Sequence, residues 1–137
     1  MAKKTEIYVD TSALIAFVDR SDSYHHLFKR LFADPSWLLT TTLVIAEGHG
    51  WFLKRYDRTK ALQFLAMLEA MDFLKILAVG GDEINTAADV MRKFSDQDLT
   101  LADAVGLSLM KQRRIRLCWS TDFHLSLTGV PLVIHQH

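Results

Sequence analysis

Cysteine, proline and glycine are all scarce in this sequence of 137 residues, which has one Cys, two Pro and six Gly. The single thiol, Cys118, has no partner for an internal disulfide, which agrees with a reducing compartment. The sequence has no Pro/Gly/Ser-rich linker and no internal repeat, so it offers no domain boundary, and its length suits one hydrophobic core. We therefore expect a single domain over residues 1–137.

Long hydrophobic runs are also missing. The longest apolar stretch, residues 13–18, is far shorter than the ~20 residues that a membrane-spanning helix needs. The first residues contain no signal-peptide core, and 50% hydrophobic with 23% charged residues is the composition of a soluble globular protein. We expect a cytoplasmic protein with no membrane partner.

Neither positive nor negative charge is in excess, because 16 Lys and Arg balance 16 Asp and Glu and the sequence pI is about 7.0. Proteins that bind nucleic acids more often carry a basic excess, since neutralising phosphates supplies much of their affinity. A neutral total still fits such a function if the acidic residues gather in one pocket and bind cations there. The rest of the surface is then left basic.

Short apolar segments of strand character alternate with helical segments along the chain. The predicted strands are residues 6–10, 37–41, 73–79 and 115–119, with 130–134 as a candidate fifth. The predicted helices are 12–19 with Ser12 as its cap, 22–33, 43–56, 59–71, 82–94 and 99–113. This alternation requires crossover connections and predicts a three-layer α/β/α fold around a mostly parallel sheet of four to five strands.

Four acidic residues stand out from this pattern. Asp10 and Asp122 lie at or just after the ends of the first and fourth strands, where ligands collect in open parallel sheets. Each of them is also explained as a turn residue or a helix cap. Glu47 lies in a strongly apolar helix, where it can equally belong to the polar face. Asp103 is placed inside a predicted helix among apolar residues, so its carboxylate needs a hydrogen-bond donor or a metal ion.

Taken together, the four carboxylates predict a metal site. Carboxylates packed close together cannot all ionise unless a cation compensates them, and an oxygen-only site suits Mg²⁺ or Mn²⁺. Such ions lower the pKa of a bound water and hold the phosphate oxygens during an in-line displacement. Phosphodiester hydrolysis needs both the activated water and the positioned phosphate, and it needs no nucleophile from the protein.

The segments that carry these acids also form recognisable motifs. They read IYVDTSALI at residues 7–15, TLVIAEGHG at 42–50, DLTLADA at 98–104 and STDFHL at 120–125. In order and spacing, and over essentially the whole chain, they resemble the four motifs of the PIN-domain family, especially the toxin ribonucleases of VapC type. Leu125 stands where an aromatic residue is common in the last motif, and no acidic position of the family pattern is missing.

The resemblance implies a role for each matching residue. The expected metal-binding and catalytic residues are Asp10, Glu47, Asp103 and Asp122, of which one or two bind the ion directly. The expected supporting residues are Ser12, which orients the first Asp or a metal-bound water, Asp98, which accompanies the third motif, and Ser120, which orients Asp122 or a phosphate oxygen.

The resemblance also implies an activity and its partners. The expected activity is that of a metal-dependent endoribonuclease, a hydrolase that uses Mg²⁺ or Mn²⁺ and leaves 5′-phosphate and 3′-hydroxyl ends. The expected partners are an RNA substrate, a small antitoxin protein and a second copy in a homodimer. Single-stranded or looped RNA is the favoured target, because its phosphates and bases are accessible.

Three other functions compete with this interpretation. A non-catalytic PIN-like module for RNA binding or assembly is the main alternative, although a carboxylate cluster is costly to keep without a metal. A phosphatase of the haloacid-dehalogenase type also begins with a strand ending in Asp, but it typically has a second Asp where this chain has Ser12. A receiver domain fits poorly, because the stretch between the first and third strands is rich in helix.

Several other residues have mainly structural explanations. The one cysteine and six histidines show no spacing typical of a zinc site. His124 is the histidine expected nearest the acidic residues, because it follows Asp122 by two residues. The Cys118 thiol is predicted to be a core group. The basic run 111–116 suits a helix C-terminus, whereas the basic residues of 54–60 fit either a phosphate-contacting surface or a solvated helix. The aromatic residues of 51–64 mostly predict core packing, with a remainder suited to a partner peptide or a dimer.

Overall fold

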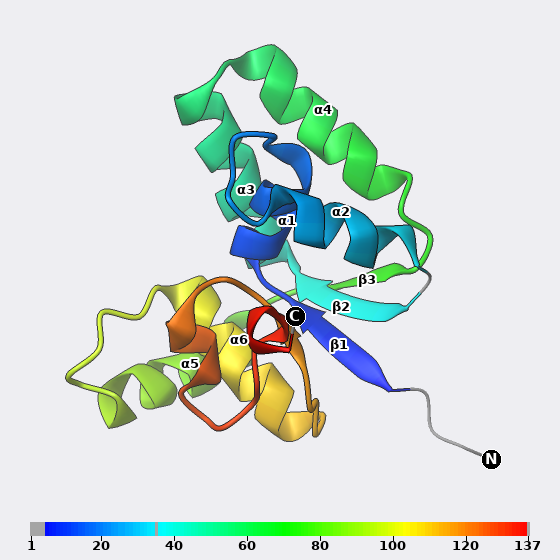
Figure 1. Ribbon diagram of the computed structural model, residues 1–137. Helices are drawn as coiled ribbons and strands as arrows, with labels where there is room; N and C mark the ends of the chain where they lie inside the picture. Colours follow the sequence, from blue (N-terminus) through cyan, green and yellow to red (C-terminus); the bar gives the residue numbers. More distant parts are fainter. Residues whose placement is uncertain (1–4, 35, 137) are drawn as a thin grey trace.

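A parallel sheet of four strands forms the centre of the computed structural model, which describes residues 5–34 and 36–136 (Figure 1). The strands are β1 (Glu6–Val9), β2 (Trp37–Thr41), β3 (Leu74–Leu77) and β4 (Cys118–Trp119). Their order across the sheet is β3-β2-β1-β4, and every pairing is parallel. The carboxyl ends of β1 and β4 are therefore neighbours, with Val9 in register with Trp119.

The helices cover both faces of this sheet. They are α1 (Thr11–Val18), α2 (His25–Ala33), α3 (Thr42–Arg55), α4 (Arg58–Glu69), α5 (Gly81–Lys93) and α6 (Leu101–Gln112), followed by the 3₁₀ turns η1 (Phe123–Ser126) and η2 (Val133–His135). In Figure 1 helices α1 to α4 lie on one side of the sheet, and α5 and α6 lie on the other. The predicted three-layer α/β/α architecture is thereby confirmed.

Side chains alternate between two hydrophobic cores because successive residues of a strand point to opposite faces. Val9 of β1 and Trp119 of β4 belong to the core under α1–α4, whereas Tyr8 and Cys118 belong to the core under α5 and α6. Cys118 is fully buried, as predicted for a core thiol. None of the described helices has the length and apolar character needed to cross a membrane.

The last part of the chain contributes fewer residues to the sheet than the sequence predicts. Residues 130–134 do not form a fifth strand, because only a single bridge joins Leu132 to Cys118 before the chain turns into η2. The fourth strand is Cys118–Trp119 rather than 115–119. Apolar character alone cannot separate a strand from a buried turn, and Ile115 is buried at the end of a helix instead.

Several helices begin at other residues than predicted, because several polar residues stand near each start and the sequence does not show which of them ends the preceding segment. Asp10, not Ser12, caps α1, and Thr41 caps α3. The second predicted helix begins at His25 instead of residue 22, after a turn in which Asp22 accepts the Tyr24 N–H. Thr100 caps α6, so this helix starts two residues after its predicted first residue.

Candidate metal centre

One cleft of about 410 Å³ at the carboxyl ends of β1 and β4 brings the four predicted acidic residues together. Asp10, Glu47, Asp103 and Asp122 all line it, although they come from four separate parts of the sequence. Asp10 and Asp122 lie directly after or near the ends of neighbouring strands, while α3 and α6 bring in the other two. The placement expected from a parallel sheet is therefore present.

Asp10 is the most enclosed of the four, with only 4% of its surface exposed. Its Oδ2 accepts hydrogen bonds from the Ser12 hydroxyl at 2.8 Å, the Ser12 N–H at 3.3 Å and the Ser120 hydroxyl at 3.0 Å. Among the described residues nothing donates to its other oxygen. Ser12 thus orients Asp10, as the sequence predicts, and leaves Oδ1 available for another ligand.

Ser120 contacts Asp10 in addition to the expected Asp122, whose backbone rather than carboxylate it bonds. Its hydroxyl donates to Asp10 and accepts the backbone N–H of Asp122 at 2.9 Å, while the Asp122 carboxylate is bonded elsewhere. The reason is the sheet, since β1 and β4 are paired and their next residues lie side by side. Ser120 therefore fixes the backbone of the last motif against the side chain of the first.

Asp103 lies in the first turn of α6 and not in its interior. Its Oδ2 accepts the Thr100 N–H at 3.1 Å, and its own N–H donates to the Thr100 hydroxyl at 3.1 Å, which is a capping box. The argument that Asp disrupts a helix interior does not apply here, because the helix was predicted to start too early. Asp103 is nevertheless buried, with 6% exposure, beside other carboxylates.

Glu47 and Asp122 complete the cluster from its more open side. Glu47 Oε1 accepts the Thr11 hydroxyl at 2.7 Å, a contact between α3 and α1 for which the sequence gave no signal. Asp122 Oδ1 accepts the His124 N–H at 3.0 Å and lies 3.2 Å from His124 Nδ1. Ligand atoms of Asp103, Asp122 and His124 lie within 4.8 Å of one another. His124 therefore contacts a carboxylate and adds a nitrogen to the donor set.

The electrostatics of the cleft favour a bound cation. Burial and, to a lesser extent, the Asp103 carboxylate raise the pKa of Asp10 to about 6, against the hydrogen bonds from Ser12 and Ser120. Burial also raises the pKa values of Asp103 and Glu47, and both are raised again by the Asp122 carboxylate. Closely spaced carboxylates with raised pKa values gain much from a positive ion.

The rim of the cleft differs from its floor. Lys54 is the one cation among the described residues that line it, and Trp51 and Ile15 give the rim an apolar side. Lys54 belongs to the basic residues of 54–60 noted in the sequence, so part of that group lies at the site. Asp98 is exposed and does not line the cleft, so the structure does not bring it to the predicted cluster.

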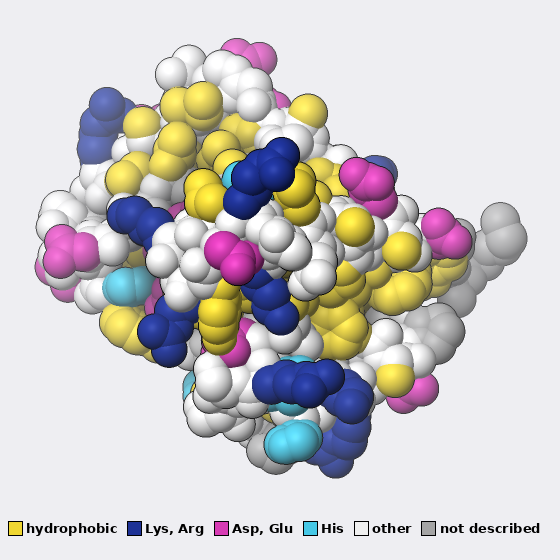
Figure 2. Space-filling model, turned by 90° about the horizontal axis from the view of Figure 1, so that it is seen from above, with side chains coloured by type: hydrophobic (Ala, Val, Ile, Leu, Met, Phe, Trp, Pro, Cys, Tyr) yellow, Lys and Arg dark blue, Asp and Glu magenta, His cyan; other side chains and the backbone are white. Residues whose placement is uncertain are grey.

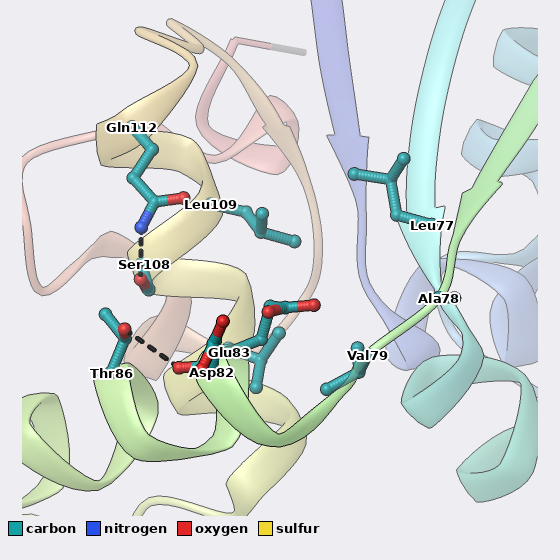
Figure 3. Close-up of a pocket in the computed structure, with 10 residues that line it drawn as sticks. Leu77, Ala78, Val79, Asp82, Glu83, Thr86, Ser108, Leu109 and Gln112 are labelled. Carbon is teal, nitrogen blue, oxygen red and sulfur yellow. Dashed lines mark hydrogen bonds between the residues drawn. The ribbon is translucent and has the colours of Figure 1, made fainter.

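A second cleft, of about 400 Å³, lies where β3 ends, between α5 and α6 (Figure 3). It also contains two acidic residues, Asp82 and Glu83, but Asp82 is exposed, and Glu83 is only partly buried and its Oε1 accepts the Gly80 N–H at 3.1 Å. Leu77 and Leu109 point toward each other across it in Figure 3. This cleft therefore lacks the crowded, buried carboxylates of the first.

Comparison with solved structures supports the fold assignment. VapC20 from Mycobacterium tuberculosis, described as a toxin that cleaves the sarcin–ricin loop, superposes with a TM-score of 0.82 at 22% identity, covering 91% of this chain and 96% of that one. A toxin–antitoxin complex from Klebsiella pneumoniae gives a TM-score of 0.61 at 16% identity, covering 92% and 94%. No curated protein sequence matches the chain.

The sequence model of the PIN domain matches residues 7–130, a range that contains all four cleft acids. The same range holds the parallel sheet from β1 to β4 and the helices that carry Glu47 and Asp103. With nine-tenths of its length matched and its motifs gathered in one cleft, this chain belongs to the PIN-domain family.

Proposed function

We propose that the protein is a metal-dependent endoribonuclease, with Asp10, Glu47, Asp103 and Asp122 as its metal-binding and catalytic residues. The observation that carries the proposal is the convergence of these carboxylates, three of them with raised pKa values, in one cleft of a PIN-domain chain. We further propose that residues 1–137 act as a single nuclease domain.

The donor set suits Mg²⁺ or Mn²⁺. Four carboxylates supply hard oxygen ligands, and Asp10 keeps one oxygen without a hydrogen bond among the described residues. Among the same residues, the contacts of the Asp122 carboxylate are all to Oδ1. The nearby His124 nitrogen suits Mn²⁺ better than Mg²⁺. When bound, such an ion supplies an activated water and compensates the charge of the phosphate.

The chain's own residues then have distinct tasks. Ser12 and Ser120 hold Asp10 in one orientation, and the Thr100 N–H does the same for Asp103, so two acids are fixed before any ligand arrives. Thr11 holds Glu47 against the end of β1. Lys54 at the rim is placed to attract a phosphate of single-stranded or looped RNA. Asp98 is assigned a supporting role outside the cleft.

We also propose that the protein is the toxin of a toxin–antitoxin pair, acting in the cytoplasm as a homodimer. Two solved structures of similar fold are described as a toxin and as a toxin–antitoxin complex. An apolar surface is available for a small antitoxin, because Leu53, Tyr56 and Leu62 on the α3–α4 side are each more than two-fifths exposed. Figure 2 shows hydrophobic side chains interspersed with Lys and Arg on the face seen from above α4.

The test of the nuclease is cleavage of structured and single-stranded RNA by the purified protein with Mg²⁺, with Mn²⁺ and with EDTA. Asp10→Asn and Asp103→Asn should abolish cutting, and Glu83→Gln, in the cleft of Figure 3, serves as the matched control. Cleavage that depends on metal and on both aspartates supports the proposal. Absence of both cleavage and metal binding by calorimetry would instead leave a PIN-like RNA-binding or assembly module.

A further inference from the structure

A basic groove of about 610 Å³ lies at the opposite end of α6 from Asp103. Four cations line it, and no acidic residue is among the lining residues that the structure describes. They are Lys93, Lys111, Arg114 and Arg116. All four side chains are exposed, so the groove offers a concentrated positive charge to solvent on a chain whose formal net charge is zero.

Within the part of the chain that the structure describes, these four cations form no ion pairs, in contrast to two immediate neighbours. Arg92 pairs with Asp89 at 2.9 Å and Arg113 pairs with Glu6 at 2.9 Å, while Lys93 and Arg114, each one residue later, form no ion pair within the described chain. A basic residue at a helix C-terminus is stabilised by the helix dipole, which accounts for Lys93 and Lys111. Arg114 and Arg116 lie beyond the end of α6, where that explanation weakens.

Arg114 adopts a backbone conformation that glycine would take more easily. Its φ is 55°, and within the described chain it is the one residue other than glycine with a positive φ. The Ile115 N–H reaches back to the Met110 carbonyl at 2.9 Å, as in a helix-ending turn where glycine is the usual residue. An arginine at this position is strained relative to glycine, so its side chain is the natural target for a test that separates backbone strain from a role in binding.

The floor of the groove is apolar. Phe94, Ile115 and Leu127 contribute to it, and Lys93 Nζ lies 5.7 Å from the centre of the Phe94 ring. Cations beside a partly exposed aromatic ring are the combination that holds nucleic acid, since the cations bind phosphates while a base stacks on the ring. An acidic peptide would use the charges but not the ring.

We propose that this groove is a second RNA-binding site, which holds the phosphate backbone of the substrate away from the bond that is cut. The inference rests on the proposed nuclease function. Helix α6 links the two sites directly, because Asp103 is in its first turn and Lys111 in its last, eight residues or about 12 Å further along the axis. A substrate must span at least this distance to occupy both sites, so the groove favours RNA of several nucleotides over a mononucleotide or dinucleotide.

The binding test compares Arg114→Gln/Arg116→Gln with Lys29→Gln/Arg30→Gln, which removes two charges from exposed positions on α2. Binding of a fluorescent RNA hairpin is measured in EDTA, so that no cleavage occurs, over a series of salt concentrations. The groove variant should bind about tenfold more weakly at low salt, and its log–log salt slope should be smaller by about 1.5. The α2 variant should match the unmodified protein.

Cleavage kinetics separate this proposal from the nuclease proposal. If the protein cuts the hairpin when metal is present, the groove variant should have a higher KM than the unmodified protein and the same kcat. Equal KM, binding and salt slope in the groove and α2 variants, with cutting intact, would overturn the second site alone. No metal-dependent cutting by the unmodified protein would overturn the nuclease. Binding of polyglutamate but not RNA by the groove would assign it to an acidic protein instead.

Arg114→Gly gives an independent check, because it relieves the backbone while removing the side chain. We expect the melting temperature to rise by about 2–4 °C and RNA affinity to fall. A purely structural arginine predicts the same stability change with no loss of RNA affinity, and that result would contradict the proposal.

Discussion

Two clefts open at the carboxyl edge of the same parallel sheet, and both contain acidic residues that cap helices. Glu83 caps α5 in one cleft, and Asp103 caps α6 in the other. They differ in burial, since Glu83 is only partly buried whereas Asp103 is buried, at 6% exposure, beside further carboxylates. Capping and metal binding are therefore compatible, and what separates a candidate metal site from an ordinary helix end is the crowding of buried charge.

Cleavage activity should separate the two clefts most strongly. Asp103→Asn keeps the size of the side chain but removes a charge from the crowded cleft, so we expect RNA cleavage to fall by about 100-fold or more. Glu83→Gln makes the equivalent change in the other cleft and should leave the rate within about twofold of the unmodified protein. Initial rates at saturating Mn²⁺ measure both. Equal losses in the two variants would mean that the clefts do not differ in function.

Stability should reveal the cost of burying Asp10. Its folded pKa is about 6 and the ordinary value is 3.8, so the carboxyl is protonated in both states at low pH. As pH rises from about 4 through about 6, the Asp10 carboxyl ionises more readily in the unfolded chain than in the folded one. The free energy of unfolding therefore decreases over this range. In EDTA at pH 7.5, Asp10→Asn should therefore be more stable than the unmodified protein by about 3 kcal/mol.

The same experiment has two internal controls. The advantage of Asp10→Asn should shrink as pH falls toward 4, and Mn²⁺ should stabilise the unmodified protein more than the variant. Urea unfolding followed by circular dichroism measures both effects. A variant that is less stable than the unmodified protein at pH 7.5 in EDTA would show that the hydrogen bonds from Ser12 and Ser120 outweigh the burial of the charge.

The approach of α6 to the sheet depends on a glycine one turn after Asp103. A Cβ at Gly106 would lie 2.9 Å from Cε2 of the buried Tyr8 ring, too close for the packed core to accept without movement. Gly106→Ala should cost about 1–2 kcal/mol of stability and displace Asp103. Gly81→Ala, at the start of α5 where a Cβ would meet nothing within 4 Å, is the matched control and should be neutral. Equal melting temperatures would contradict the packing argument.

The smallest effect belongs to the capping contact in the cleft of Figure 3. Glu83 accepts the Gly80 N–H at 3.1 Å, and it also contributes negative charge to the first turn of α5. Glu83→Gln keeps the acceptor but removes the charge, so stability should fall by about 0.5 kcal/mol. Thermal unfolding at low and high salt tests this, because a loss that persists in high salt would not be electrostatic.

Local sequence was enough to predict the strands, the helices and the acids at the strand ends. Alternating segments predicted the three layers, and the end of β1 predicted the position of Asp10. The predictions failed where an element's limit depends on its neighbours. Residues 130–134 look like a strand but pack as a turn, and α6 begins two residues late because Thr100 forms a capping box with Asp103.

The sequence by itself determined which residue types could form a metal site and the order in which the chain presents them. Only the tertiary structure decided their contacts, as when Ser120 bonded to Asp10 across the β1–β4 pair, Thr11 bonded to Glu47, and His124 joined the cluster. It also decided that Asp98 stays outside. The physical reason is that hydrogen bonds and pKa shifts act over a few ångströms, while the residues concerned are up to 110 positions apart in sequence.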